Sequence, residues 1–500
     1  MATIVETRYG KIEGVREGST NVFRGVPFAA PPVGERRFAP PLPPDPWTGV
    51  RQAQAFDSVS HQSSIGLGFM GAGRQPQSED CLYLNVWTPG LDGAKRPVMV
   101  WIHGGAFVLG AGSEPLYDGR RLSERGDVVV VTINYRLGAL GYLAHESLVD
   151  ARTGACGNWG LLDQIAAIEW VRDNVESFGG DPANVTIFGE SAGSMSVTTV
   201  MGTPRAAGLF RRAIAQSGAP EVATAEAAAA TAEKVLAMAG IGAAGLRDLP
   251  AEAFVEIQQK LMMSGSAGGG LSGEAMAFRP VIDGAVLPRS PFDAIAAGEA
   301  RDVSLLIGSN RDEMKLFAMM DSGTEVTEEV LLTRLGSSLD DASARHAVEV
   351  YRKARESRGE AIDPKELWQA METDRFFRAP AMRFAGLQAR HQAEIYAYLF
   401  CWPSPMEALG SPHAVELPFV FGTLDAPMID MFAGSGPEAE NLSALVQDAW
   451  IGFARSGNPA HAGLGDWPRL ETGRRPVMIL DRECGVQDDP RSDELGVWLG

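Results

Sequence analysis

Residues 184–194 read NVTIFGESAGS, and they join a short apolar segment to a run of small residues through Gly-x-Ser-x-Gly. The apolar segment predicts a buried strand, and the small residues predict the first turn of a helix. Ser191 would lie on a tight turn between the two, beside the unpaired N–H groups of the helix N-terminus. Because the chain has 57 glycines, chance alone supplies roughly 0.4 copies of this pentapeptide. A nucleophilic serine and a merely structural turn both fit the pattern.

The segments before this turn predict a parallel sheet. Residues 128–133 form a near-continuous β-branched run, as expected of a strand that is buried on both faces. Residues 161–178 have helical periodicity and end at Gly179-Gly180, a helix-stop signal. A strand, a helix and then the strand of residues 184–188 predict a parallel crossover.

Strands and helices continue to alternate along the chain. We expect a hairpin at residues 1–20 around Tyr9-Gly10-Lys11, ordered irregular chain at the proline-rich residues 23–47, and a mobile loop at the glycine-rich residues 264–273. Further strands are expected at residues 81–87, 98–103, 303–307, 394–400 and, as the last short strand, 477–480, and helices at residues 221–260, 325–393 and 442–454. The chain is therefore predicted to be one α/β domain, residues 1–500, with helical insertions around 221–300 and 325–393.

Composition and charge exclude several classes of protein. With 45% hydrophobic and 21% charged residues, the chain of 500 residues has the composition of an ordinary globular protein. The formal net charge is −19 and no run of Lys or Arg interrupts it, so nucleic-acid binding is not expected. No apolar run approaches the roughly 18 residues that cross a bilayer. The N-terminus also lacks the basic start and apolar core of a signal peptide, so no membrane association is expected.

The cysteines and one glycine-rich segment give no sign of a metal or cofactor site. The four cysteines are far apart and have no metal-ligand spacing, so we expect reduced thiols in a cytoplasmic protein; they are Cys81, Cys156, Cys401 and Cys484. Residues 66–71 match a dinucleotide fingerprint formally, but they follow no strand and precede no helix. That match is rejected for lack of context.

A serine hydroxyl becomes a nucleophile only when a base accepts its proton and a third group orients that base. The chain offers Ser191, then an acid, then a histidine, which is the order of the α/β-hydrolase fold. Glu313 lies just past an expected strand, although Asp312 competes with it by adjacency. His413 lies in the loop after the strand expected at residues 394–400, and strand ends are where such sheets place their sites.

Other histidines compete with His413 for the role of base. Two lie in expected helices, two lie in polar loops that no strand precedes, and one precedes a glycine pair; they are His346, His391, His145, His461 and His103. His103 is expected to shape its turn rather than to titrate. Position alone does not decide between His413 and these rivals.

The pair Gly104-Gly105 has a direct use in ester chemistry. Stabilising an oxyanion requires backbone N–H groups that approach the substrate without a side chain in the way. A turn of this type after the strand at residues 98–103 supplies two such groups, and the N–H of Ala192 supplies a third. An ordinary glycine turn is the alternative.

Several longer segments resemble the type-B carboxylesterases, the family of the cholinesterases and para-nitrobenzyl esterases. Residues 78–86 (SEDCLYLNV) and 188–194 (FGESAGS) are similar to the two signatures of that family. Further similar segments are residues 23–27 (FRGVP), 134–138 (NYRLG), 158–164 (NWGLLDQ), 216–218 (QSG), 413–422 (HAVELPFVFG) and 453–459 (FARSGNP). The resemblance spans roughly residues 5–480.

The resemblance implies an α/β-hydrolase fold, with a large, mostly parallel central sheet flanked by helices. It also implies a serine carboxylesterase with Ser191 as nucleophile, Glu313 as acid, His413 as base, and Gly104, Gly105 and Ala192 as the oxyanion hole. Such an enzyme hydrolyses small neutral esters through an acyl-enzyme intermediate without a metal or cofactor. We expect a monomer or a small homo-oligomer.

Three departures from the family pattern narrow this expectation. Residues 1–80 contain no cysteine, so the disulfide that eukaryotic members form to the position of Cys81 is absent, as in a bacterial-style member. Residues 60–79 contain no tryptophan to hold a choline cation, so neutral esters are expected instead. Met314 follows Glu313 where relatives usually have glycine, which alters the local pocket.

Two alternatives to an esterase remain at this point. A carbamate or aryl-amide hydrolase would use the same three residues on a different bond. A non-catalytic binding protein, like the neuroligins that resemble this family, would have lost the nucleophile and would be anchored in a membrane.

Overall fold

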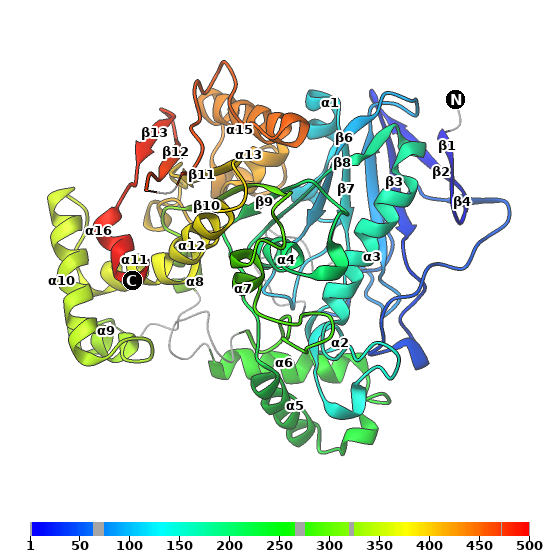
Figure 1. The fold of residues 1–500 in the computed structure, drawn as a ribbon, viewed down its shortest axis with the longest axis horizontal. Coiled ribbons are helices and arrows are strands. Elements are labelled where there is room, and N and C mark those ends of the chain that lie inside the picture. The colour runs from blue at the N-terminus through cyan, green and yellow to red at the C-terminus, as the bar shows by residue number, and fades with distance from the viewer. Residues whose placement is uncertain (1–2, 64–74, 266–275, 320–324, 472, 500) are drawn as a thin grey trace.

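A computed structural model describes residues 3–63, 75–265, 276–319, 325–471 and 473–499. The described residues form one thirteen-stranded sheet with helices on both faces (Figure 1). The strands are β1 (Thr3–Thr7), β2 (Gly10–Glu17), β3 (Thr20–Pro27), β4 (Val50–Gln52), β5 (Tyr83–Thr88), β6 (Arg96–Ile102), β7 (Val129–Ile133), β8 (Gly180–Glu190), β9 (Arg212–Gln216), β10 (Ser304–Asn310), β11 (Ile395–Phe400), β12 (Pro476–Leu480) and β13 (Gly485–Asp488). The expected hairpin at the N-terminus is confirmed as β1 and β2.

The sheet is parallel at its centre and antiparallel at its ends. Its strand order is β1-β2-β3-β5-β7-β6-β8-β9-β10-β11-β12-β13, and β4 pairs beside β2. Neighbours from β7 to β12 are parallel, whereas β5 and β13 run antiparallel to their inner neighbours. The predicted crossover is confirmed, because β7 and β8 both lie parallel to β6 on its two sides. The carboxyl ends of the central strands therefore meet at one edge.

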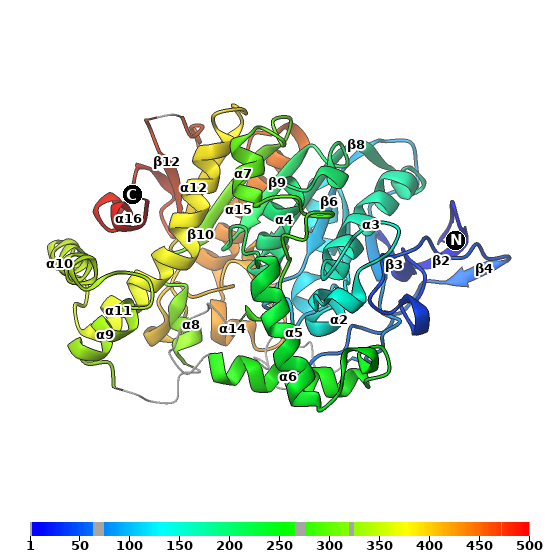
Figure 2. The same cartoon turned by 60° about the horizontal axis from the view of Figure 1, so that its bottom comes forward.

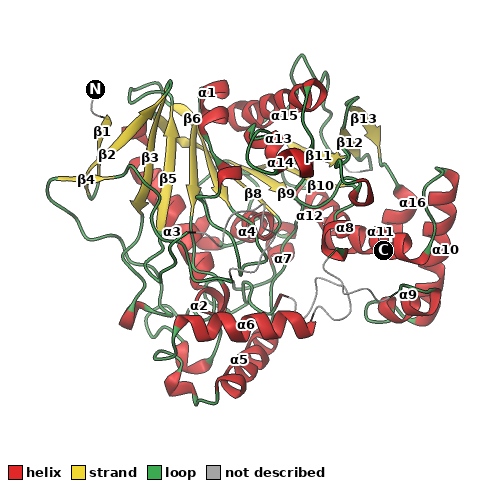
Figure 3. Ribbon diagram, turned by 180° about the vertical axis from the view of Figure 1, so that it is seen from behind, coloured by secondary structure: helices red, strands yellow, loops and turns green. Residues whose placement is uncertain are grey.

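Successive side chains of the central strands enter two different cores, as the period of a strand requires. In β6, Val98 and Val100 belong to one apolar cluster and Met99 and Trp101 to the other. The first cluster lies under α3, α4 and α12, and the second under α1, α13 and α15. Figure 2, tilted so that the bottom of the molecule comes forward, shows α3, α4 and α12, and Figure 3, seen from behind, shows α1, α13 and α15. Because the central strands are buried on both faces, the sequence segments that form them are rich in apolar residues.

The helices that carry this arrangement follow the strands closely. They are α1 (Arg120–Gly126), α2 (Gly138–Tyr142), α3 (Trp159–Asn174), α4 (Ala192–Met201), α5 (Ala225–Ala239), α6 (Ala251–Gly265), α7 (Pro291–Ala296), α8 (Met314–Ala318), α9 (Glu328–Leu335), α10 (Asp341–Ser357), α11 (Pro364–Thr373), α12 (Ala379–Gln388), α13 (Leu417–Phe421), α14 (Ile429–Ala433), α15 (Pro437–Ser456) and α16 (Ser492–Leu499). The helices predicted at residues 221–260, 325–393 and 442–454 are confirmed. Within the second of these regions, α9, α10 and α11 share a small core of their own.

Four sequence expectations need correction. Residues 23–27 belong to β3 (Thr20–Pro27) rather than to irregular chain, because Phe23 and Val26 are buried and Pro27 lies at the strand's end, where its missing N–H is tolerated. The strand at residues 476–480 is not the last, because the short, polar β13 follows it. His391 lies in a turn beyond α12 rather than in a helix. The loop expected at residues 264–273 begins inside the last turn of α6.

Some expectations fall wholly or partly outside the described residues. The remainder of that loop, from residue 266, is among them, and so is the rejected fingerprint at residues 66–71. All four cysteines are described, and all four are free thiols. Across the described ranges, no helix combines the length and the apolar composition needed to cross a bilayer.

Candidate active site

Ser191 occupies the sharp turn between β8 and α4 that its sequence context predicts. Its backbone has φ +56° and ψ −124°, which is uncommon for a residue with a side chain and marks local strain. Two hydrogen bonds hold this conformation: the N–H of Ser191 donates to the Gln216 carbonyl at 2.9 Å, and the Ser191 carbonyl accepts from Met195 N–H at 2.8 Å. The side chain therefore projects from a fixed turn at the edge where the central strands end.

The glycines around Ser191 are required by the closeness of strand and helix. A Cβ on Gly193 would lie 2.0 Å from the Ile102 carbonyl oxygen of β6. A Cβ on Gly189 would lie 2.6 Å from the same oxygen and equally close to the Gly193 backbone. Since real Cβ atoms never approach this closely, only glycine fits at both positions. The Gly-x-Ser-x-Gly pattern is thus explained by packing.

The structure brings the three predicted oxyanion donors beside this turn. Gly104 follows β6, and a Cβ there would lie 2.7 Å from the Glu190 carbonyl oxygen and 3.2 Å from Ser191 Cβ. Gly105 has φ +102° and packs so tightly on the Leu109 carbonyl that a Cβ would lie 2.3 Å from its oxygen. Ala192 is the first residue of α4, so its N–H has no carbonyl partner within the helix.

His103 shapes the glycine turn, as the sequence predicts. One of its ring nitrogens, Nδ1, lies 2.8 Å from the Gly104 carbonyl oxygen, and its ring stacks on Tyr135 with centroids 4.4 Å apart. Burial lowers the pKa of His103 to about 4, so this ring stays neutral near pH 7.

Glu313 and His413 lie in direct contact. The Nδ1 atom of His413 is 2.6 Å from Glu313 Oε2, and both side chains are buried. The other oxygen of Glu313 accepts a hydrogen bond from Asn310 N–H at 2.6 Å, which fixes the carboxylate. Asp312 points instead toward the loop before His413, where it accepts from Ser411 N–H at 2.9 Å. Of the two acids that competed in the sequence, Glu313 is the one that reaches the imidazole.

Glu190 is a site residue whose contact with His413 sequence reasoning missed. Its Oε1 atom lies 3.0 Å from the second ring nitrogen of His413, Nε2. The alignment is not that of a hydrogen bond, because this oxygen is buried without a hydrogen-bond partner. Among the described residues, the Ser191 hydroxyl is not a hydrogen-bond partner of His413 either. Adjacency to Ser191 at the end of β8 was the one available signal for Glu190.

These carboxylates change the acid–base properties of His413. Burial lowers the pKa of the imidazole, but the charges of Glu190 and Glu313 raise it more, and the result is about 9. Burial also raises the pKa of Glu190 well above its ordinary value and that of Glu416 to about 6. The site therefore favours the protonated imidazolium near neutral pH.

Aromatic rings cover the other side of His413. The rings of Phe317 and Phe377 lie with centroids 4.9 and 5.0 Å from the imidazole. Phe377 belongs to a π-helical turn, Asp374–Arg378, between α11 and α12, and such turns are frequent at functional sites. Met314, the residue after Glu313, is buried and adds apolar surface near the site. Met263, near the end of α6, is 78% exposed and therefore does not line a buried pocket. The surroundings of the imidazole are apolar on this side.

Two other features of the described residues lie apart from this arrangement. A surface cavity of about 810 Å³ between α1, α14 and α15 is lined by none of the six predicted site residues. Within the described part of the chain, His, Cys, Asp and Glu side chains form no group of three that could hold a metal ion.

Comparison with known proteins gives a consistent result. The carboxylesterase family model matches residues 1–498. The chain is 41% identical to the para-nitrobenzyl esterase of Bacillus subtilis (strain 168) over 98% of this chain and 97% of that protein. It is 34% identical to the phenmedipham hydrolase of Pseudarthrobacter oxydans, covering 99% of this chain and 98% of that protein.

Solved structures agree with the sequence relatives. A PNB esterase structure superposes with a TM-score of 0.89 at 40% identity and full coverage of both chains. A carboxylesterase of Geobacillus stearothermophilus gives a TM-score of 0.87 at 39% identity, covering 99% of this chain and all of that one. The predicted α/β-hydrolase fold is confirmed, and ester hydrolysis is favoured over the two alternatives. The chain therefore belongs to the carboxylesterase family and is a carboxylic ester hydrolase.

Proposed function

We propose that the enzyme hydrolyses neutral carboxylic esters through an acyl group carried on Ser191. The observation that carries this proposal is the 2.6 Å contact between His413 Nδ1 and Glu313 Oε2 at the edge of the sheet where Ser191 occupies its strained turn. A carboxylate on Nδ1 fixes the tautomer that leaves Nε2 available as a base. Glu313 is thus the orienting acid, His413 the base and Ser191 the nucleophile.

The first half of the reaction forms the acyl-enzyme. Neutral His413 accepts the proton of Ser191 at Nε2 while the serine oxygen attacks the ester carbonyl carbon. The N–H groups of Gly104, Gly105 and Ala192 stabilise the oxyanion that forms. The protonated imidazole then donates its proton to the leaving alcohol, and the ester bond breaks.

In the second half, water replaces the alcohol. His413 accepts a proton from water, the hydroxide attacks the acyl carbon, and the proton returns to the Ser191 oxygen as the carboxylic acid leaves. Glu190 lies 3.0 Å from Nε2 of His413, and its negative charge favours the protonated form of the ring. Because this contact is not an aligned hydrogen bond, Nε2–H remains free to donate to the leaving group.

Neutral esters are the substrate class that this site supports. The rings of Phe317 and Phe377 and the buried Met314 provide apolar surface beside His413. Residues 60–79 contain no tryptophan that could hold a quaternary ammonium group. The name of one relative, para-nitrobenzyl esterase, also describes the ester of an uncharged alcohol.

We further propose a cytoplasmic enzyme that acts as a single domain over residues 1–500, as a monomer or a small homo-oligomer. Four free thiols support a reducing compartment. Strands from β1 to β13 share one continuous sheet, which supports a single unit. Size-exclusion chromatography with light scattering measures the oligomeric state directly.

Replacing the nucleophile tests the proposed function. Ser191→Ala should lower kcat on p-nitrophenyl butyrate by several orders of magnitude, because the triad acts as a unit. Ser194→Ala is the matched control, since this serine lies in the same motif but donates to the Gly218 carbonyl at 2.8 Å. It should keep kcat. Loss of activity in Ser194→Ala but not in Ser191→Ala would overturn the assignment.

A further inference from the structure

The contact between Glu313 and His413 depends on two loops of very different length. Glu313 lies three residues beyond β10, which ends at Asn310, so the strand itself places it. His413 lies thirteen residues beyond β11, which ends at Phe400, in mostly irregular chain. A loop of that length does not hold a side chain to a fraction of an ångström unless other contacts fix it.

Asp312 makes two of the contacts that fix this loop. Its backbone N–H donates to the Ser411 carbonyl at 2.9 Å, and its carboxylate oxygen Oδ2 accepts from Ser411 N–H at 2.9 Å. Ser411 is fully buried, and its hydroxyl donates to the Phe400 carbonyl at 2.9 Å. Asp312 directly precedes Glu313, and Ser411 lies two positions before His413. The contact between Asp312 and Ser411 therefore links the two loops close to both residues of the pair.

The chain approaches the Asp312 carboxylate as closely as a glycine allows. Gly410 has φ +59°, and a Cβ on it would lie 2.3 Å from Asp312 Oδ2 and 2.8 Å from Cγ. A side chain at position 410 would separate Asp312 from Ser411. The loop is thus shaped around this carboxylate.

Asn310 holds the loop from the other side. Its side-chain nitrogen Nδ2 donates to the Pro412 carbonyl at 2.8 Å and to Glu416 Oε2 at 2.6 Å. Its backbone N–H donates to Glu313 Oε1. Asp312 consequently contacts the loop before His413, at Ser411. Asn310 contacts the chain on both sides of His413, at Pro412 and at Glu416.

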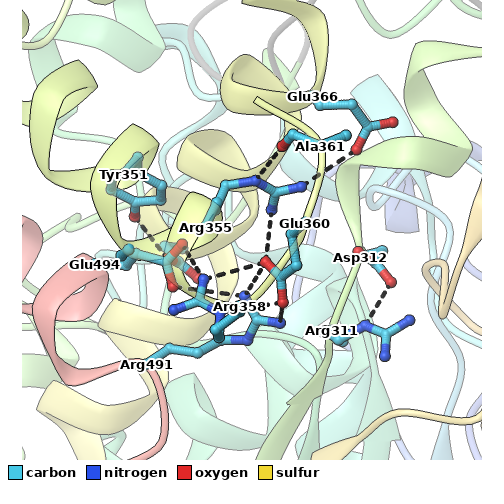
Figure 4. A network of polar contacts seen from close by, with 12 residues as sticks. Arg311, Asp312, Tyr351, Arg355, Arg358, Glu360, Ala361, Glu366, Arg491 and Glu494 are labelled. Atoms are coloured by element: carbon cyan, nitrogen blue, oxygen red, sulfur yellow. Dashed lines mark hydrogen bonds and ion pairs between the residues drawn. The ribbon is translucent and has the colours of Figure 1, made fainter. Parts of the chain in front are cut away.

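A positive charge keeps the Asp312 carboxylate in place. Arg311 Nε donates to Asp312 Oδ2 at 2.9 Å. Figure 4 shows this pair beside a group of ion pairs around α10 and α16, in which Arg358 pairs with Glu494 at 2.7 Å and Arg491 pairs with Glu360. These ion pairs lie near Asp312, but the role of Asp312 itself rests on its contacts with Ser411.

We infer that Asp312 is a positioning residue, which sets the register of the loop that carries His413 relative to Glu313 and so holds the imidazole in its productive place. This rests on the proposed function, in which Glu313 and His413 act together. Within the described residues, Asp312 contacts Ser411 and Arg311 and makes no hydrogen bond to Ser191 or His413, so it would act through the loop. Its loss should therefore lower kcat while leaving KM almost unchanged, since a displacement of about 1 Å can cost on the order of 100-fold in rate.

Three variants test this inference on p-nitrophenyl butyrate. Asp312→Ala removes the acceptor for Ser411 N–H, and should lower kcat about 10- to 100-fold with KM within about twofold. Asp312→Asn keeps an amide oxygen in the same place, and should restore most of kcat. Gly410→Ala leaves every polar group present but pushes Asp312 and Ser411 apart, so it should lower kcat as Asp312→Ala does.

A matched control separates positioning from loss of stability. The Thr88 hydroxyl, at the end of β5, donates to the Phe178 carbonyl at 2.7 Å, in a buried position toward the opposite end of the sheet from both loops. Thr88→Val should lower the melting temperature and leave kcat unchanged. If Asp312→Ala fails to fold, Asp312→Asn and Gly410→Ala decide the question.

The outcomes distinguish this inference from the proposed function. Unchanged kcat in Gly410→Ala or Asp312→Ala, or equal losses in Asp312→Ala and Asp312→Asn, would overturn the positioning role. If in those cases Ser191→Ala still abolishes hydrolysis, the triad stands and only this inference fails. Activity that persists in Ser191→Ala would instead overturn the proposed function.

Discussion

The second ring nitrogen of His413 lies 3.0 Å from the carboxylate of Glu190, the residue directly before Ser191. Glu313 Oε2 lies 2.6 Å from the first ring nitrogen, Nδ1, so two carboxylates contact one buried imidazole. Their charges outweigh the effect of burial and raise the pKa of His413 to about 9. A base with this pKa is mostly protonated at neutral pH, which makes the activity sensitive to pH.

The value of kcat/KM should therefore rise with pH toward about 9 in the free enzyme, because only neutral His413 can accept the Ser191 proton. Glu190→Gln removes one of the charges that raise this pKa, so the imidazole loses its proton at lower pH. The rising limb should move to lower pH by about one unit or more.

A series of kcat/KM measurements between about pH 6 and 10 would check this. Asp425→Asn is the control, since Asp425 is an exposed partner of Arg121 and should leave the limb in place. A limb that does not move in Glu190→Gln, or that moves to higher pH, would contradict the role given to the Glu190 charge.

The free energy of unfolding should also depend on pH through His413, and the direction of this dependence follows from its raised pKa. The folded-state pKa of His413, about 9, lies above the ordinary value of a histidine, about 6.5. Its ion pairs therefore stabilise the fold fully below about pH 6.5, and this contribution is lost as pH rises through about 9. Urea unfolding of wild type and His413→Gln at several pH values should give curves that converge at high pH. A difference that grows with pH would have the wrong sign.

Glu313→Gln should lower kcat on the order of 10⁴-fold, because an amide on His413 Nδ1 favours the wrong tautomer. Asp312→Asn should retain most of kcat, since an amide oxygen can still accept from Ser411 N–H. Steady-state kinetics on one ester compares the two variants directly. If the order of the two losses were reversed, the acid would have to be reassigned to Asp312.

Gly104→Ala should lower kcat by about 100- to 1000-fold, the usual effect of losing one oxyanion donor. The added Cβ would lie 2.7 Å from the Glu190 carbonyl and 3.2 Å from Ser191 Cβ, so the turn must move. Gly242→Ala is a suitable control, because a Cβ there meets nothing within 4 Å. Equal activity in the two variants would remove Gly104 from the oxyanion hole.

Choline acetate and its uncharged isostere, 3,3-dimethylbutyl acetate, test the preference for neutral esters. A net charge of −19 attracts cations at long range, but this mainly speeds encounter and fades with salt. A fitted cation–π contact is worth about 2- to 30-fold in kcat/KM. At physiological salt we expect a ratio near one or in favour of the neutral ester. A choline preference above about tenfold would mean that an aromatic ring holds the cation.

The motif-bearing part of the site could be predicted from sequence, and the contacts between distant loops could not. Ser191 and Gly104 lie in short segments whose glycines are dictated by local packing, so pattern alone locates them. The choice of Glu313 over Asp312 depends on where two side chains point, and adjacency in the chain leaves it open. Glu190 was missed as a partner of His413 because their contact joins β8 to a loop more than 200 residues later.

The same distinction holds for the fold. Strands with a buried apolar run, such as β7 and residues 305–307 of β10, were predictable, because strands buried on both faces read as near-continuous apolar segments. The short, half-exposed β13 and the edge strand β4 have no such pattern, since their pairing comes from neighbouring strands. Residues 23–27 of β3 were predicted to be irregular because a proline-rich stretch begins there, but the contacts with β5 pair them into the sheet.

The central claim, that Ser191 is the nucleophile activated by His413 and Glu313, is tested most directly by covalent labelling. An organophosphate such as diisopropyl fluorophosphate should modify one serine per chain, and peptide mass spectrometry should place the label on Ser191. His413→Gln and Glu313→Gln should be labelled far more slowly, and Ser191→Ala not at all. A stoichiometric label on any other serine of the wild type, or labelling of Ser191→Ala at the wild-type rate, would contradict the claim.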